Sequence, residues 1–302
     1  KASDRHNGGK FSIIVTFSNH KKLIFKPKSA CNDFFMNEYV DVLGLPPSMT
    51  LGLPKIIESG DDYFWSEYIE HTYLDTENDL VDFYKNAGAA LSVMDSLNFS
   101  DGHHENFVCG GDRKLHIVDT ETILVNLSYF EDKLDTFYDI TFTGMIEDKN
   151  QSQHYISALQ AGSTFFNYPV SLKVLNDLST DISVKYNTTQ RNEYAKSSPC
   201  REPTSVERYS EHCLNGARGA YTAIADTDTT TLLDALQRNT HSLKLRQIQR
   251  HTLYYQWLIH RLAHPMNGAE DEFINRNMRN YPDEMVAYEL KHLKNGDVPV
   301  FY

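Results

Sequence analysis

The hydrophobic pattern changes its period part-way along the chain, and this change limits the folds that the chain can adopt. The first 72 residues hold short β-rich runs at 11–17, 23–26, 55–57 and 63–70, the first two joined by a polar turn as in a hairpin. Later segments repeat apolar residues at i, i+3, i+4 and i+7, as amphipathic helices do. The sequence therefore predicts an α+β protein with a β-rich N-terminal lobe (1–72) and a larger helical C-terminal lobe (73–302).

The predicted helices have recognisable ends, since Gly44, Pro265 and the pair Asn295-Gly296 each follow a periodic segment. Two short strands around Gly110-Gly111 form a second hairpin that leads to Asp119. The segment 126–205 is rich in Asn, Ser, Thr and Tyr, and we expect loops and short elements there. Helices are predicted at 33–43, 77–97, within 206–240, at 242–264 and at 283–294.

The charge of the chain argues against nucleic-acid binding, and its apolar runs argue against a membrane span. Lys and Arg number 29 against 41 Asp and Glu, so the net charge is 29 − 41 = −12 with His neutral. Non-specific nucleic-acid binding relies on clustered cations, so we expect no nucleic acid among the partners of this acidic chain. No apolar run approaches the roughly 18 residues that a membrane span needs.

The four cysteines form no C-x-x-C pair and predict free thiols in a reducing cytoplasm. His103 and His104 are adjacent, so they point apart on an extended chain, and nothing nearby completes a zinc site. We therefore expect a cytoplasmic protein without zinc. The first residue is not Met and no signal peptide follows, so both ends read like cuts through a longer protein.

The first polar motif is Asp4-x-His6-x-Gly8-Gly9, beside the first hairpin. A glycine pair lets backbone amides approach an anion closely, although glycines between strands are more often part of a turn. A strand lysine, Lys26, follows. In kinase-like folds such a lysine holds nucleotide phosphates and pairs with a helix carboxylate, for which Glu38 is the candidate. The alternative is a surface lysine in a lysine-rich hairpin.

A loop that carries Asp101 and Asn106 follows a long helix, and Asp119 comes after the next hairpin. This order is that of protein kinases, in which the first Asp orients the hydroxyl and the Asn and later Asp coordinate Mg²⁺. His103 lies where the loop could contact phosphate or hydroxyl. Each acidic residue taken alone is more often a solvated side chain than a catalytic one. The ordered set with Lys26 upstream is a more specific signal for a kinase-like site.

Several motifs together resemble the dehydratase domain of class II lanthipeptide synthetases, the LanM type. They are S-D-x-H-N-G-G-K, F-K-P-K, D-G-H-H-E-N-F, I-V-D-T-E-T, L-R-Q-I-Q-R-H-T-L-Y-Y, A-H-P and G-D-V-P-V-F-Y. The resemblance covers most of the chain and is weak from about 126 to 205. It implies a distant lipid-kinase-like fold with added elements.

The resemblance implies ATP-dependent phosphorylation of Ser and Thr in a precursor peptide, followed by elimination of the phosphate to dehydroalanine or dehydrobutyrine. ATP and Mg²⁺ would be the cofactors. The precursor peptide and a C-terminal cyclase domain, which we expect to lie outside this fragment in the parent chain, would be the partners. The implied catalytic residues are Asp4, His6, Lys26, Asp101, His103, Arg246 and Thr252; the implied cofactor-binding residues are Lys26, Glu38, Asn106 and Asp119; the implied metal ligands are Asn106, Asp119 and Glu121.

Two details depart from a simple reading. Lys28 stands where the family usually has Arg, which puts a bidentate role there in doubt. Arg246 and Thr252 are six residues apart, about 600° on a helix, so they cannot share one helix face. Either the helix starts after Arg246, or Arg250 takes part as well.

Two other functions stay open. One is a kinase-like phosphotransferase that stops at the phosphate, which the Arg246 and Thr252 motif argues against. The other is a peptide-binding pseudo-enzyme, which the intact set of Asp101, Asn106 and Asp119 argues against.

Overall fold

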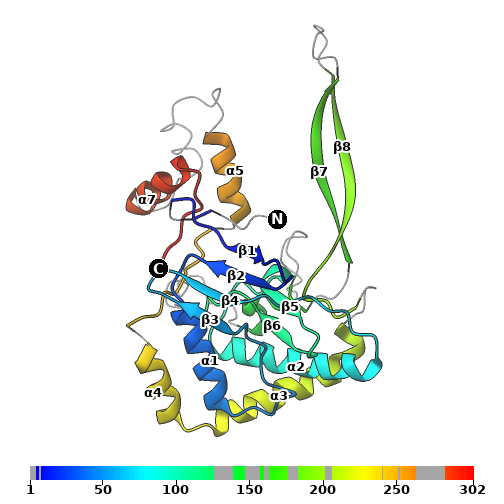
Figure 1. Cartoon of the computed structure of the whole chain (residues 1–302), viewed down its shortest axis with the longest axis vertical. Helices are drawn as coiled ribbons and strands as arrows, with labels where there is room; N and C mark the ends of the chain where they lie inside the picture. Colours follow the sequence, from blue (N-terminus) through cyan, green and yellow to red (C-terminus); the bar gives the residue numbers. More distant parts are fainter. Residues whose placement is uncertain are drawn as a thin grey trace.

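A small antiparallel sheet lies over a layer of helices in the computed structural model of the chain (Figure 1). The structure describes these residues: 5–6, 8–125, 139–146, 157–159, 163–175, 183–200, 206–239, 241–250, 252–262 and 283–302. For 163–175 and 183–194, and for Leu253 and Arg261, it describes the backbone alone. Within these ranges, no helix is long and apolar enough to serve as a membrane span.

The β-rich start of the chain is confirmed as a four-stranded sheet. Its strands are β1 (Ile13–Thr16), β2 (Lys22–Lys26), β3 (Ile56–Ser59) and β4 (Phe64–Glu67), all antiparallel and in the order β1-β2-β4-β3. The predicted hairpin pairs Ile13 with Phe25 and Thr16 with Lys22. β2 is therefore an inner strand, and its last residue, Lys26, lies opposite Phe64 on β4.

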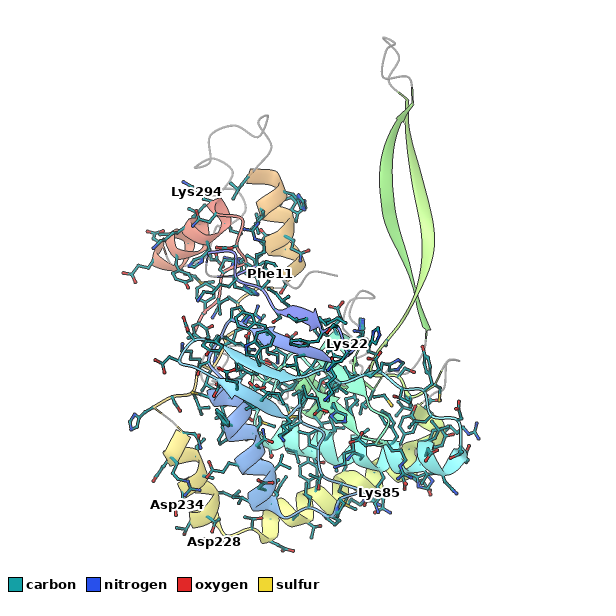
Figure 2. The ribbon with its side chains drawn as sticks, viewed as in Figure 1. Phe11, Lys22, Lys85, Asp228, Asp234 and Lys294 are labelled. Carbon is teal, nitrogen blue, oxygen red and sulfur yellow. The ribbon has the colours of Figure 1, made fainter. Side chains whose placement is uncertain are left out.

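Three helices, α1 (Cys31–Leu43), α2 (Glu77–Ser96) and α3 (Ser210–Asp226), supply much of the apolar core. α1 ends as predicted, because Gly44 adopts φ 57°, a left-handed conformation that glycine takes without strain. α2 and α3 cross closely, since a Cβ on Gly88 would lie 1.8 Å from the carbonyl oxygen of Cys213. Side chains fill the space between the sheet and α2, the two layers marked by Lys22 and Lys85 in Figure 2.

The remaining elements frame the loops of the site. β5 (Phe107–Cys109) and β6 (Leu115–Ile117) form the predicted hairpin. α4 (Thr229–Asn239) packs on α1, and α7 (Asp283–Lys294), also predicted, packs on α5 (Thr252–Leu262). Short 3-10 turns are η1 (His104–Asn106), η3 (Ile140–Thr143) and η4 (Val206–Tyr209).

The prediction of loops and short elements over 126–205 is wrong for part of that segment. β7 (Ser163–Leu175) and β8 (Ser183–Tyr194) form a long antiparallel ribbon that extends away from the body of the protein (Figure 1). Both strands are rich in β-branched and aromatic residues, which favour strands without strict alternation. The rest of the segment lies partly outside the described residues.

The helix predicted over 242–264 begins only at Thr252. Residues 241–250 are not helical, because their backbone groups are used in bonds to distant segments. The Arg246 amide donates to the Glu121 carbonyl at 2.9 Å, and the Gln247 amide donates to the Phe301 carbonyl at 2.8 Å. Arg246 and Thr252 therefore do not lie on one helix, and their angular separation no longer matters.

The mixed helix and sheet class is confirmed. The bilobal, kinase-like architecture and its division at residue 72 stay predictions.

Candidate active site

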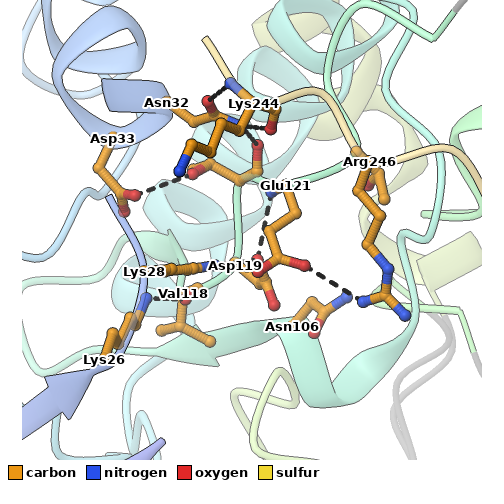
Figure 3. A network of polar contacts seen from close by, with 12 residues as sticks. Lys26, Lys28, Asn32, Asp33, Asn106, Val118, Asp119, Glu121, Lys244 and Arg246 are labelled. Carbon is orange, nitrogen blue, oxygen red and sulfur yellow. Dashed lines mark hydrogen bonds and ion pairs between the residues drawn. The ribbon is translucent and has the colours of Figure 1, made fainter. Parts of the chain in front are cut away.

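The centre of the site is an ion-pair cluster that joins the segment after β2 to the loop after β6 (Figure 3). Lys28 Nζ lies 3.1 Å from Asp119 Oδ1 and 2.7 Å from Glu121 Oε1. Arg246 Nη1 lies 3.2 Å from the other oxygen of Glu121. Two cations and two carboxylates thus meet where the sequence predicted a phosphate site.

The charges in this cluster shift the pKa of its members. Burial alone would raise the pKa of Asp119, but Lys28 and Lys26 outweigh it and hold the pKa well below its ordinary value. Burial would lower the pKa of Lys28, and here Asp119 and Glu121 hold it well above its ordinary value. Asp119 is therefore a carboxylate at neutral pH, as a metal ligand must be.

Lys26 is buried at 6% exposure and donates to the Val118 carbonyl at 2.6 Å. Its Nζ also lies 5.1 Å from the Phe64 ring centroid. Burial lowers its pKa, opposed first by Asp33. No carboxylate in the described ranges lies within ion-pair distance of Lys26, so its charge is poorly compensated and suited to an incoming anion.

The expected pairing of Lys26 with Glu38 is wrong. Glu38 accepts hydrogen bonds from Arg238 and Asn239 on α4. Asp33 and Glu38 are five residues apart on α1, about 500° or a net 140° of rotation, so they face different neighbours. The α1 carboxylate that acts on Lys26 is Asp33, and Glu38 joins α1 to α4 instead.

The loop after α2 is closed by its own side chains. Asn106 Nδ2 donates to the Asp101 carbonyl at 2.9 Å and to Asp101 Oδ2 at 3.2 Å, while Asp101 holds φ 74°. Burial raises the pKa of Asp101, and His103 and Arg246 counteract it. His103 pairs with Ser157 through the backbone. The structure thus brings Asp101, Asn106 and Arg246 into one neighbourhood.

The Gly8-Gly9 amides bind an anion, but it is a carboxylate of the chain itself. Both glycines have φ 84°, and their N–H groups donate to the two oxygens of Asp297 at 2.7 and 2.9 Å. His6 Nδ1 lies 2.9 Å from the Val298 carbonyl oxygen. Asp4 lies outside the described residues.

The two arginines of the C-terminal motif have different surroundings. Arg246 belongs to the ion-pair cluster, whereas Arg250 makes a two-pronged contact of 2.8 and 3.0 Å with Glu289 on α7. Arg250 is therefore held in a buried structural pair. Thr252 is the half-buried first residue of α5.

Sequence reasoning doubted a role for Lys28 and left it out of the site, and it missed two further polar residues, Asn32 and Asp33. Asp33 accepts from Thr120 Oγ1 at 3.2 Å, and Asn32 bonds to two separate loops. The sequence signal for Asn32 and Asp33 was that two polar residues begin a helix and apolar residues follow them directly. Such residues are also common at solvated helix ends, so the signal is weak.

Two open cavities near the start of α1 share Ser29 and Lys244. The larger has a volume of about 330 Å³ and lies between the start of α1, the β3–β4 turn and the segment 241–244. The smaller is lined by Lys28, Asp33 and Glu121, among others.

Comparison with known proteins adds family information. The whole chain, residues 1–302, matches the family described as a domain of unknown function, DUF4135. The lacticin 481/lactococcin biosynthesis protein LcnDR2 of Lactococcus lactis subsp. lactis is 23% identical over 326 aligned residues. The alignment covers 99% of this chain and 35% of that protein, so the chain spans about a third of the relative's length.

Proposed function

The chain belongs to the DUF4135 domain family, and from this premise we propose that it is the dehydratase part of a lanthipeptide synthetase. It would phosphorylate Ser and Thr of a precursor peptide with ATP and then eliminate the phosphate. The motif resemblance and the relative named for lacticin 481 biosynthesis support this proposal. The fold would be kinase-like, the setting cytoplasmic, and a cyclase domain would act on the dehydrated peptide.

One observation carries the proposal: a buried, weakly compensated lysine lies beside a cluster in which two carboxylates form ion pairs with two further cations. Lys26 has no carboxylate at ion-pair distance within the described ranges, while Lys28 bridges Asp119 and Glu121. Such an arrangement suits an ionic ligand that carries both signs of charge, as a metal–nucleotide complex does.

The oxygen donors of the site fit Mg²⁺. In the described ranges no three His, Cys, Asp or Glu side chains are placed to hold a metal alone. Mg²⁺ commonly takes one or two carboxylates and completes its coordination with water and phosphate. Asp119, Glu121 and the side-chain oxygen of Asn106 would hold it, because the Asn106 nitrogen is turned to Asp101. When bound, Mg²⁺ would neutralise charge on the transferred phosphoryl group.

In the phosphorylation step, Asp101 would orient the peptide hydroxyl and accept its proton as the oxygen attacks the γ-phosphorus and the bond to the β-phosphate breaks. Its burial supports this role, since a raised pKa makes a carboxylate a better base near neutral pH. Lys26 would contact the phosphates from the strand side.

In the elimination step, a base removes the α-proton, the electron pair forms the Cα–Cβ double bond, and phosphate leaves with the Cβ–O pair. Arg246 would bind the departing phosphate, because a guanidinium is permanently charged and binds phosphate with two parallel hydrogen bonds. The phosphate would then compete with Glu121 for this guanidinium. Thr252 is proposed for the same step on the motif resemblance.

One observation favours a second candidate, a peptide-binding pseudo-enzyme. Lys28 already forms ion pairs with both Asp119 and Glu121, the carboxylates proposed for Mg²⁺. In a binding module these pairs would serve the structure alone. The two candidates differ in whether phosphate is transferred.

The deciding experiment incubates the protein with ATP, Mg²⁺ and its cognate precursor peptide, with mass spectrometry of the peptide. We expect loss of one water per modified residue. Asp119→Ala should abolish both the phosphopeptide and the dehydrated peptide. Arg246→Met or Thr252→Ala should instead accumulate the phosphopeptide. Arg250→Met is the matched control, since that arginine is committed to Glu289. An unmodified peptide throughout would reject the dehydratase and favour the binding module.

A further inference from the structure

The side chain of Asn32 joins two loops that are far apart in the sequence. Asn32 lies at the start of α1 and is buried at 6% exposure. Its amide oxygen accepts from the Lys244 N–H at 3.0 Å, and its amide nitrogen donates to the Lys244 carbonyl at 2.7 Å. The same nitrogen donates to the Thr120 carbonyl at 3.3 Å. One side-chain amide thus joins Lys244 to Thr120, and Figure 3 shows its contact with Lys244.

Each of these loops carries part of the proposed active site. Thr120 separates Asp119 from Glu121. Lys244 is two residues before Arg246, whose backbone and guanidinium both bond to Glu121. The bond to Lys244 is therefore close in the chain to the phosphate-binding arginine.

The two loops differ in how strongly they are held without Asn32. The loop with Asp119 and Glu121 follows β6 and is also fixed by Lys28 and by the Thr120–Asp33 bond. The segment 241–250 is neither helix nor strand. Within the described ranges, its hydrogen bonds to the core near the carboxylate loop are those to Asn32 and Glu121, and Gln247 bonds further along to Phe301. Loss of Asn32 would release this segment more than the carboxylate loop.

We propose that Asn32 is a positioning residue that holds Arg246 at the carboxylate loop, so that elimination depends on it more than phosphorylation does. This inference rests on the proposed function for its activity readout. Position 32 requires a side-chain amide, because its surroundings present one backbone N–H, which needs an acceptor, and two carbonyl groups, which need a donor. An aspartate of the same shape accepts from the N–H but faces both carbonyl oxygens with no donor.

The first test measures products. With ATP, Mg²⁺ and the precursor peptide, Asn32→Asp should raise the ratio of phosphopeptide to dehydrated peptide by roughly tenfold, the effect of losing one buried hydrogen bond to the segment that carries Arg246. A synthetic phosphopeptide supplied directly should be eliminated more slowly by a similar factor. A parallel loss of both steps would show a merely structural role and overturn the proposal, as would an unchanged ratio.

Asn86→Asp is the matched control. Asn86 is also a buried helix asparagine that bonds two backbone segments, accepting from the Leu115 N–H and donating to the Thr50 carbonyl, both at 2.9 Å. We expect it to lose stability as Asn32→Asp does, with an unchanged product ratio. A shifted ratio in this control would mean that general destabilisation moves the ratio, and the proposal would fail.

The second test needs no activity and separates this inference from the proposed function. Hydrogen exchange at the Arg246 amide, which bonds to Glu121 and not to Asn32, should become faster by roughly tenfold in Asn32→Asp. Unchanged protection there would overturn the positioning role. If the parent protein modifies no peptide but this exchange responds, the proposed function fails while the positioning of Arg246 stands.

Discussion

Replacement of Arg250 should destabilise the protein strongly without altering its chemistry. The Arg250 side chain is 7% exposed and that of Glu289 is 0% exposed. The Glu289 carboxylate accepts two guanidinium bonds, at 2.8 and 3.0 Å, and a third from Tyr255 Oη at 2.7 Å. Arg250→Met would leave this carboxylate buried with the tyrosine as its main remaining partner.

Breaking one side of a buried ion pair typically costs about 3–5 kcal/mol. Large chains shift their melting temperature by about 2–4 °C per kcal/mol, so we expect a fall of roughly 6–20 °C. The double variant Arg250→Met, Glu289→Gln should recover most of this loss. It removes the uncompensated charge and still offers Tyr255 an oxygen acceptor.

Thermal and urea unfolding of the parent, both single variants and the double variant provide the measurement, alongside product analysis at a temperature where all are folded. A loss below about 1 kcal/mol in Arg250→Met would refute the buried-pair reasoning. So would a double variant as unstable as the single one. Accumulation of phosphopeptide by folded Arg250→Met would place Arg250 at the elimination step instead.

Three further outcomes follow from the site. Lys26→Met should lose phosphorylation while its unfolding free energy stays within about 1 kcal/mol of the parent. The reason is that a buried cation without a carboxylate partner gains little stability from its charge. A large loss of stability would contradict this. The pKa of Asp119 lies below its unfolded value of about 3.9, so its stabilisation is present above roughly pH 4 and is lost as the pH falls further; Lys28→Met should unfold with a shallower acid dependence, and an identical one would contradict the pairing. Asp297→Ala should cost about 2–3 kcal/mol, because two glycine amides lose their acceptor, and Asp297→Asn should cost less; equal melting temperatures for all three proteins would exclude this role.

Local patterns were sufficient to predict most elements of the fold. The α1 helix is marked by its apolar stripe and by Gly44, and the first hairpin by two β-rich runs. The segment before Thr252 misled prediction because its sequence has helical periodicity. Its backbone is instead used in bonds to Glu121 and Phe301, and a helical pattern in one segment gives no sign of such distant partners.

The site was predictable where residues follow one another in a motif and unpredictable where they meet across the fold. Asp101 and Asn106 are five residues apart, and they do bond. The helix carboxylate nearest in effect to Lys26 was misassigned because the choice between Asp33 and Glu38 depends on the rotation of α1 against the sheet. Residue order cannot fix that rotation.

The bond between Asp297 and the Gly8-Gly9 turn has a practical meaning for recombination. The turn next to His6 is shaped by a carboxylate that comes from nearly 290 positions further along the chain. A chimera that joins the first half of this protein to the second half of a relative would pair a turn with a foreign acceptor. The two short segments that hold the turn and its acceptor therefore form one structural unit, and a chimera has to exchange them together.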